Sequence, residues 1–285
     1  MSTSKYRYVV FGSNGFVGNA VASNLEKKGI TTIRVTKKDH DFLSKSLWHQ
    51  NNLLNENDIL IFAAAQAPVK SFHGYQENMA ILENFLLNFS NRGFRYIVNI
   101  SSDAVFSDSL EAICEDSPLG PTSLHGCMHL VREIALNASF GEQVLHVRPT
   151  LIFGPQDPHG GYGPNKFIRE ANTHGVISLY GRGEELRDHI YIDDVAEIVA
   201  QASLNRVTGV LNATTGKVSS FLQIAELIAQ QIPNISINFL PRVSPPPHLG
   251  IRKFSNKRMG ELFPEFVFTS LNEGLDLSHY KFGRK

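Results

Sequence analysis

Short apolar runs along this chain alternate with segments whose apolar residues recur at helical spacing. The segment 15–28 places Val17, Ala20, Val21 and Leu25 on one face of a helix, and Gly29 follows it as a C-cap would. Further helices are predicted at 75–89, 124–138, 166–173 and 221–232. The short apolar runs predict strands at 6–11, 31–35, 58–63, 96–100, 144–148 and 209–212.

The apolar runs do not alternate strictly with polar residues, and helices separate them. This pattern is typical of a parallel sheet that is covered on both faces, so the predicted fold class is α/β with a doubly wound parallel sheet. After about residue 155 glycine and proline become frequent, yet regular elements resume after each such stretch. That change predicts long loops over a ligand site rather than a linker.

Composition narrows the function classes. The 285 residues are 42% apolar and 19% charged, with 27 Lys plus Arg against 27 Asp plus Glu, so a nucleic-acid partner is not expected. No apolar run reaches the roughly 18 residues of a membrane span. The two cysteines, Cys114 and Cys127, do not make a disulfide framework, and the expected location is the reducing cytoplasm.

A glycine-rich turn joins the first predicted strand to the first helix. It contains Gly12, Asn14, Gly15, Phe16, Val17 and Gly18. In this context Gly12 permits the tight turn, Gly15 lets the backbone approach a pyrophosphate, and Gly18 allows close helix–sheet packing. The helix N-terminus offers free N–H groups to the phosphates. We therefore predict a dinucleotide site, and the alternative is a glycine-rich turn without a ligand.

The residues after the second strand bear on the choice of cofactor. NAD sites usually place an acid here, whereas this chain has Thr36, Lys37 and Lys38. Lysines would attract the 2′-phosphate of NADP, so NADP is the preferred prediction and NAD stays possible. The two lysines could equally face solvent.

Ordered motifs along nearly the whole chain resemble the extended short-chain dehydrogenase/reductases, a family of nucleotide-sugar epimerases, dehydratases and reductases. Besides the glycine turn they include Asn78, the string 101–106 (SSDAVF), the string 148–155 (RPTLIFGP) and the string 187–194 (RDHIYIDD). Within the family the chain looks most like the dTDP-4-dehydrorhamnose reductases, because of the run from Lys37 to Phe42, the string 102–106 (SDAVF) and the modest length. The resemblance implies a Rossmann domain over 1–154, to which 182–214 return, and a smaller substrate-binding region from 155–181 and 215–285.

The same resemblance implies roles for individual residues. Asp41 and Phe42 would lie near the adenine, and the cofactor riboses would rest on the segment Ala63, Ala64 and Ala65. Arg148 would also belong to the cofactor site. A nucleotide sugar would be the substrate, bound by Asn165, Arg187 and Arg252, the two arginines contacting its diphosphate. An internal salt bridge is the alternative for Arg187. The helices 75–89 and 124–138 would form a homodimer interface, or would be buried against the sheet.

The catalytic pair of the family is a Tyr and a Lys four residues later, and this chain replaces both. Pro121, Gly126 and Glu133 match the family spacing, which puts His125 at the Tyr position and His129 at the Lys position. An imidazole titrates near neutral pH, so His125 would be the general acid/base. His129 would orient the site, and Ser102 would hydrogen-bond the reacting oxygen. Asp103 is either an acid of the site or a partner of its own loop.

Two other interpretations of the histidine pair remain open. The protein could be a binding subunit without hydride chemistry, or His125, His129 and Glu133 could hold a metal at i, i+4 and i+8. We predict that no metal is bound. Dehydration is disfavoured, because Ala104 stands where the family's dehydratases place a Glu. The preferred function is reduction of a nucleotide-linked keto sugar, with an epimerase that retains NAD as the enzymatic alternative.

Overall fold

The computed structural model describes residues 6–44, 54–55, 57–92, 94 and 96–282. Its contacts divide the chain into two compact units. Unit 1 holds residues 1–107, 118–149 and 195–211, and unit 2 holds 108–117, 150–194 and 212–285.

Unit 1 is built on a six-stranded sheet in the order β2-β1-β3-β4-β5-β9. Neighbouring strands from β2 to β5 are parallel, as predicted from the apolar runs. Because the order reverses direction between β1 and β3, that point is where ligands bind in open α/β sheets. The strands are β1 (Tyr8–Phe11), β2 (Thr32–Val35), β3 (Ile59–Phe62), β4 (Ile97–Ile100), β5 (Val144–Pro149) and β9 (Gly209–Ala213).

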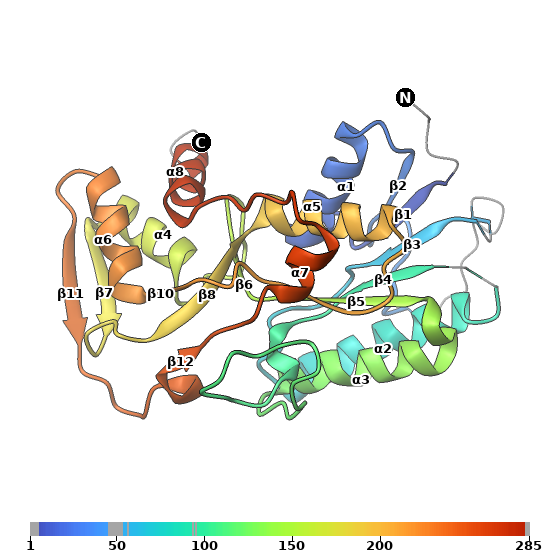
Figure 1. Ribbon diagram of the computed structural model, residues 1–285, viewed down its shortest axis with the longest axis horizontal. Coiled ribbons are helices and arrows are strands. Elements are labelled where there is room, and N and C mark those ends of the chain that lie inside the picture. The colour runs from blue at the N-terminus through green and yellow to red at the C-terminus, as the bar shows by residue number, and fades with distance from the viewer. Residues whose placement is uncertain (1–5, 45–53, 56, 93, 95, 283–285) are drawn as a thin grey trace. The chain divides into compact units, whose positions relative to one another are not determined.

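Helices cover both faces of this sheet (Figure 1). On one face α1 (Phe16–Lys27) and α5 (Ile192–Leu204) lie together, joined by Asn24 and Lys28, which both bond to Glu197. On the other face α2 (Phe72–Phe89) packs against α3 (Leu124–Phe140). The doubly wound α/β prediction is therefore confirmed.

Aromatic side chains fill the core between the sheet and α2. The rings of Phe62 and Phe85 stack with centroids 4.0 Å apart, and Phe11 meets Phe85 edge-on at 5.4 Å. Phe42 joins this cluster at 6% exposure. Burying rings of this size contributes to the hydrophobic stabilisation of unit 1. Phe11 and Phe62, the last residues of β1 and β3, belong to this cluster, so it packs against the point where the sheet order reverses.

Unit 2 combines smaller sheets with helices. Strand β8 (Leu186–Tyr191) pairs with β6 (Leu151–Phe153) and β12 (Ile251–Arg252) in parallel and with β10 (Val218–Ser220) antiparallel. A separate parallel pair joins β7 (Val176–Tyr180) to β11 (Ser236–Leu240). The helices are α4 (Pro164–His174), α6 (Phe221–Gln231), α7 (Lys257–Leu262) and α8 (Leu271–Phe282), with short 3-10 turns at η1 (Asp103–Val105) and η2 (Gly141–Gln143) in unit 1 and η3 (Pro247–Gly250) in unit 2.

The contacts divide the chain differently from the predicted domains. Residues 182–194 and 212–214, expected to return to the dinucleotide domain, belong to unit 2, and so do residues 108–117. One cause is β8, which pairs with β6, β10 and β12 rather than with the large sheet. Another is the backbone bond from Ile113 to Lys253, which ties 108–117 to unit 2.

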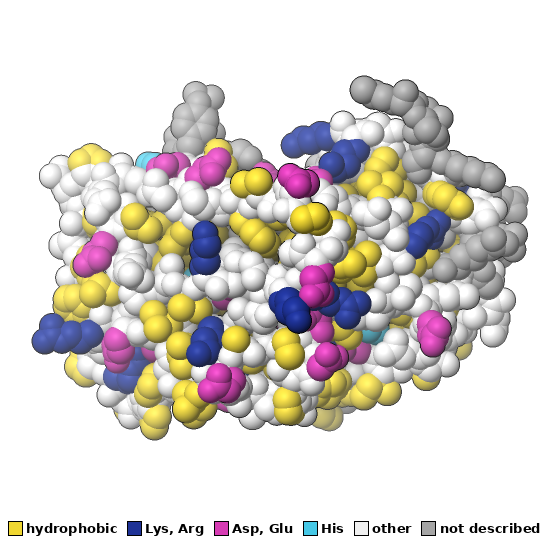
Figure 2. Space-filling view, viewed as in Figure 1, with side chains coloured by type: hydrophobic (Ala, Val, Ile, Leu, Met, Phe, Trp, Pro, Cys, Tyr) yellow, Lys and Arg dark blue, Asp and Glu magenta, His cyan; other side chains and the backbone are white. Residues whose placement is uncertain are grey.

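The surface of the described residues shows no membrane-spanning helix, and the face in view (Figure 2) mixes charges of both signs. No helix within the described residues is long and apolar enough to cross a membrane. On the face shown in Figure 2, Lys and Arg side chains are interspersed with Asp and Glu side chains.

Candidate active site

The glycine turn after β1 is shaped so that side chains would not fit. Gly12 has φ +80, and a Cβ there would lie 2.7 Å from the backbone of Ala64. A Cβ on Gly18 would lie 2.3 Å from the carbonyl oxygen of Gly12. Asn14 and Gly15 are exposed, whereas Gly18 is buried. The turn therefore brings the first turn of α1 against the carboxyl ends of β1 and β3.

The N-terminus of α1 is left open. No side chain of the described residues caps it, and its first turn carries no acid. The nearby hydroxyl Oγ of Ser13 is buried without a hydrogen-bond partner in the described part of the chain. Unsatisfied N–H groups and the helix dipole suit an anion, and Phe16 and Val17 begin the helix at this point. These features fit the pyrophosphate of a dinucleotide.

At the end of β2 the two lysines point to solvent. Lys37 is 67% exposed and pairs with Asp41 at 3.6 Å, while Lys38 is exposed. Thr36 bonds through its N–H and its hydroxyl to Asp39. The lysine charges are thus available to a phosphate, but a solvent-facing role has the same geometry.

The segment that would carry the cofactor riboses follows β3. Ala63, Ala64 and Ala65 are half-buried. The guanidinium of Arg132 donates to the carbonyl oxygen of Ala64 at 2.9 Å and to that of Phe62 at 2.5 Å. Phe42, by contrast, is packed into the aromatic core, with its ring 4.5 Å from that of His40. A contact of Phe42 with an adenine stays a prediction.

A helix cap and a close glycine contact position α3 against the segment that follows the carboxyl end of β4. Ser123 caps the helix by accepting a bond from the N–H of Gly126 at 3.1 Å. A Cβ on Gly126 would lie 2.1 Å from the carbonyl oxygen of Ala104, so only glycine allows this contact. The half-buried Ser102 accepts from the Ala104 N–H and lies 3.4 Å from Asp103. The helix that carries both histidines is therefore held against the segment that carries Ser102.

His125 and His129 lie one turn apart on α3 with their rings in edge contact. The ring centroids are 4.7 Å apart at an interplanar angle of 87°. His125 is half-buried, whereas His129 is 5% exposed and its Nδ1 has no hydrogen-bond partner among the described residues. Burial, and then the neighbouring His125 and Arg132, hold the pKa of His129 well below its ordinary value. His129 is therefore neutral at physiological pH.

Glu133 is committed to structural partners. Its carboxylate accepts from Ser101 at 2.5 Å and pairs with Arg148 through two bonds of 2.9 and 2.6 Å. Arg148 is 3% exposed and also lies over the ring of Phe106. A role of Arg148 toward a cofactor stays a prediction, because its charge already has an internal partner. Within the described residues no three His, Cys, Asp or Glu side chains form a group that could hold a metal ion.

The predicted substrate residues lie in unit 2, where each has an internal partner. Asn165 binds the Gly154 N–H and Asp157. Arg187 pairs with Glu185 at 2.6 Å and donates to the Pro247 carbonyl oxygen at 2.8 Å. This is the internal salt bridge that the sequence left open as an alternative. Arg252, 4% exposed, pairs with Asp108 at 2.9 Å.

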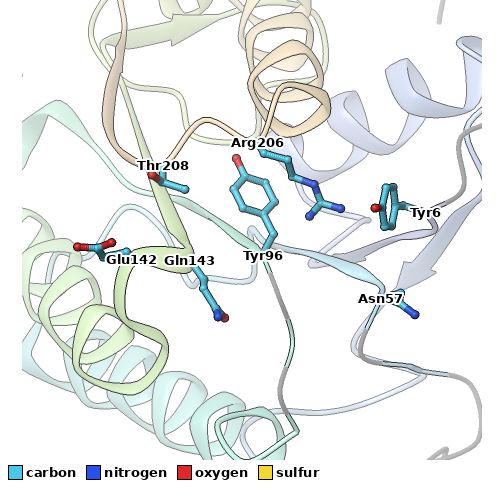
Figure 3. Close-up of a pocket in the computed structure, with 7 residues that line it drawn as sticks. All are labelled: Tyr6, Asn57, Tyr96, Glu142, Gln143, Arg206 and Thr208. Carbon is cyan, nitrogen blue, oxygen red and sulfur yellow. The ribbon is translucent and has the colours of Figure 1, made fainter.

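A pocket of about 290 Å³ lies at the opposite edge of the unit 1 sheet (Figure 3). Its lining residues precede the strands: Tyr6 comes before β1, Tyr96 before β4 and Thr208 before β9. The guanidinium of Arg206 lies between the rings of Tyr6 and Tyr96, 4.5 and 5.1 Å from their centroids (Figure 3). Open α/β sheets bind ligands beyond the carboxyl ends of their strands, so this amino-edge pocket is not the dinucleotide site.

The glycine turn and the N-terminus of α1 form a cradle at the carboxyl ends of β1 and β3. Comparison with known families agrees with a dinucleotide site at this cradle. The family model described as the NAD dependent epimerase/dehydratase family matches residues 8–213. The chain belongs to this family. The match spans the glycine turn and the histidine pair.

Individual similar proteins are distant in sequence. The UDP-N-acetyl-alpha-D-glucosaminuronate decarboxylase of Bacillus cytotoxicus is 26% identical over 263 residues, covering 79% of this chain and 80% of that protein. The solved structure of the NAD-dependent NDP-hexosamine 5,6-dehydratase TunA has a TM-score of 0.83 at 19% identity and 99% coverage of both chains. The Thermus thermophilus UDP-glucose 4-epimerase in complex with NAD has a TM-score of 0.82 at 22% identity, covering 98% of this chain and 99% of that one. At these identities the two structures establish the shared fold.

One residue of this family member was not singled out from its sequence. Arg132 stands at i+7 from His125 and therefore lies on the same helical face as both histidines. A charged residue in a stripe that faces the sheet was the available signal, but charges on helices usually face solvent. Arg132 departs from that rule, because its side chain is only 2% exposed.

Proposed function

We propose that this protein binds NAD or NADP in unit 1 and exchanges hydride with a nucleotide-linked sugar, with His125 as the general acid/base. The observation that carries the proposal is the open N-terminus of α1 over a glycine cradle, on the same unit as the edge-packed histidine pair. The names of the relatives, a decarboxylase, an epimerase and a dehydratase of nucleotide sugars, support the substrate class.

The residues of unit 1 suit the parts of a dinucleotide. The amides at the start of α1 would hold the pyrophosphate, with Ser13 as a further donor. Ala63–Ala65 would support the riboses, and Lys37 and Lys38 would meet a 2′-phosphate where one is present. When bound, the nicotinamide accepts or supplies the hydride.

The proton would move through His125. In the reducing direction His125 donates its proton to the carbonyl oxygen while hydride reaches the carbon, and solvent restores the proton. In the oxidising direction neutral His125 takes the hydroxyl proton. Ser102, which precedes η1, would hold the same oxygen by a hydrogen bond.

Two forms of this chemistry remain candidates, each with its own support. Net reduction of a keto sugar by NADPH is favoured by the two exposed lysines at the end of β2. Transient oxidation with retained NAD, as in an epimerase, is favoured by the relatives, whose names include a UDP-glucose 4-epimerase in complex with NAD.

Nicotinamide absorbance during incubation with NADPH or NADH and a panel of nucleotide-linked 4-keto sugars tests the first form. Loss of absorbance with one sugar would establish a reductase and its substrate class. Proton NMR of UDP-glucose and UDP-N-acetylglucosamine incubated with the protein and NAD tests the second form. New sugar signals without net change in NAD would establish an epimerase.

A third result would refute both forms. If the protein binds a dinucleotide, yet neither consumes it nor converts any sugar of the panel, it is a binding subunit without hydride chemistry. Binding is measured separately by calorimetry, so that a misfolded preparation is recognised.

A further inference from the structure

Arg132 is a buried cation without a carboxylate partner. Its side chain is 2% exposed, and no Asp or Glu of the described residues pairs with it. Its two terminal nitrogens donate to main-chain carbonyl oxygens, its Nε has no partner in the described part of the chain, and its guanidinium lies 3.5 Å from the ring centre of Phe62. Burial lowers the pKa of Arg132 to about 9, so it still carries its charge at neutral pH.

A buried arginine without a counterion lowers the stability of the folded protein. A buried ion without a counterion loses several kcal/mol of hydration, and carbonyl dipoles return only part of it. A leucine or methionine at this place would fill the same space without that cost. The neighbouring Arg148 shows the usual solution, since Glu133 neutralises it with two hydrogen bonds. Glu133 is thus committed to Arg148, and within the described residues no carboxylate pairs with Arg132.

The position of that charge links the two halves of the candidate site. Arg132 lies on the same face of α3 as the two histidines, at i+7 from His125 and at i+3 from His129. Its hydrogen bonds end on Phe62 and Ala64, at the carboxyl end of β3. Ala64 is also the residue against which Gly12 packs. One side chain therefore connects the histidine-bearing face of α3 to the backbone of the dinucleotide cradle.

The charged and titratable groups around the pair leave Arg132 as the fixed charge. On α3 these groups are His125, His129 and Glu133, and Glu133 is paired with Arg148 of β5. His146, also on β5, is neutral at physiological pH, because burial lowers its pKa to about 4. The strands β3 and β4, with sequences ILIF and IVNI, contribute no charge.

We propose that Arg132 is a positioning residue that ties the Ala63–Ala65 segment to α3 and places a fixed positive charge on the helix face that carries His125 and His129. The part played in catalysis rests on the proposed function, whereas the effects on His129 and on the cradle do not.

The test separates the charge from the tether. Histidine ring signals are followed by NMR from pH 8 to pH 4.5 in the wild type, Arg132→Met and Arg132→Lys, with assignment through His125→Gln and His129→Asn. We expect wild-type His129 to titrate well below the ordinary imidazole pKa. Because burial is the largest cause of the low His129 pKa and Arg132 the smallest of three, Arg132→Met should raise the midpoint of His129 without bringing it to the ordinary imidazole value. Arg132→Lys should restore the wild-type titration.

Dinucleotide affinity provides the second measurement. Arg132→Met should weaken binding about tenfold, because the Ala64 carbonyl loses its donor. Arg132→Lys should recover this only in part, since a single ammonium does not reproduce two separated donors. Arg92→Met, which removes a guanidinium stacked on Phe89 in the same unit, should change neither His129 nor affinity.

Each result decides the proposal. Folded Arg132→Met with unchanged His129 titration and unchanged affinity would overturn it. If Arg132→Met does not fold, either of two other results assigns Arg132 to folding alone and overturns the proposal. One is a wild-type His129 that titrates near pH 6.5. The other is an Arg132→Lys variant whose dinucleotide affinity and His129 titration are both unchanged. A shifted His129 in a protein that converts no sugar would uphold the positioning role and refute the proposed function instead.

Discussion

A Cβ atom on Gly18 would lie 2.3 Å from the carbonyl oxygen of Gly12, so the first turn of α1 rests directly on the turn that precedes it. Gly18→Ala must displace backbone on both sides. We expect NAD and NADP affinity to fall at least tenfold, and unfolding free energy to fall by about 1–3 kcal/mol. Calorimetric titration and urea unfolding measure the two effects.

Gly260→Ala is the matched control for that substitution. A Cβ there meets no atom within 4 Å, and the residue lies inside α7. Alanine is a better helix former, so stability should stay equal or rise by up to about 1 kcal/mol, with unchanged affinity. If Gly18→Ala also bound both dinucleotides normally, the cradle would not be their site.

The lysines after β2 give a prediction about cofactor choice. The double variant Lys37→Met with Lys38→Met should weaken NADP about tenfold while changing NAD little, because only NADP places a phosphate near them. Lys27→Met removes an exposed lysine at the end of α1 and serves as the control. Equal losses for NAD and NADP would argue against a 2′-phosphate contact.

The extent to which the sequence anticipated the structure differs between the two units. In unit 1 every predicted strand and helix is present, because buried parallel strands and their helices carry strong local patterns. The helix α5, most of which belongs to unit 1, was not predicted. In unit 2 the strands β7, β8 and β11 were not predicted, and in β8 the polar residues Arg187 and Asp188 interrupt the apolar pattern. Asp188 is buried because Thr150, Thr214 and Thr215 donate to it, a contact between segments distant along the chain.

The candidate site shows the same limit. The glycine turn was recognisable from spacing alone, since its conformation requires glycine locally. The role of Arg132 depends on carbonyl groups that lie 68 and 70 residues earlier in the chain, which no local pattern reports. The internal partners of Arg187 and Arg252, Glu185 and Asp108, likewise became evident only from the folded chain.

His125→Phe tests the acid/base assignment. The ring keeps the edge contact with His129 but removes the titratable nitrogens, so turnover should fall at least a thousandfold while dinucleotide affinity stays within about twofold. His174→Gln, at an exposed position near the end of α4, should retain full turnover. Turnover that survives in His125→Phe would refute the assignment.

Buried histidines predict acid sensitivity. Burial lowers the pKa of His146 and of His189 to about 4, below the ordinary 6.5. Below pH 6.5 the unfolded chain binds protons that the folded chain does not, so stability falls from there toward pH 4, by up to about 3 kcal/mol for each histidine. Urea unfolding at pH 7 and pH 5 should show this loss. His146→Gln should reduce it by up to about 1.4 kcal/mol per pH unit, whereas the 82% exposed His73→Gln should not.

The apolar side chains exposed on α2 and α3 predict self-association. Leu87 is 62% exposed and Ile134 is 60% exposed, although α2 and α3 pack against each other and against the sheet. If these helices form the homodimer interface, Leu87→Glu and Ile134→Glu would place carboxylates in an apolar contact and give monomers, without loss of monomer stability. Light scattering after size-exclusion chromatography measures the mass. Leu204→Glu, 45% exposed at the end of α5 on the other face of the sheet, should leave a dimer intact. A wild type that is monomeric at high micromolar concentration, or a dimer that survives both charged variants, would show that this face is not the interface.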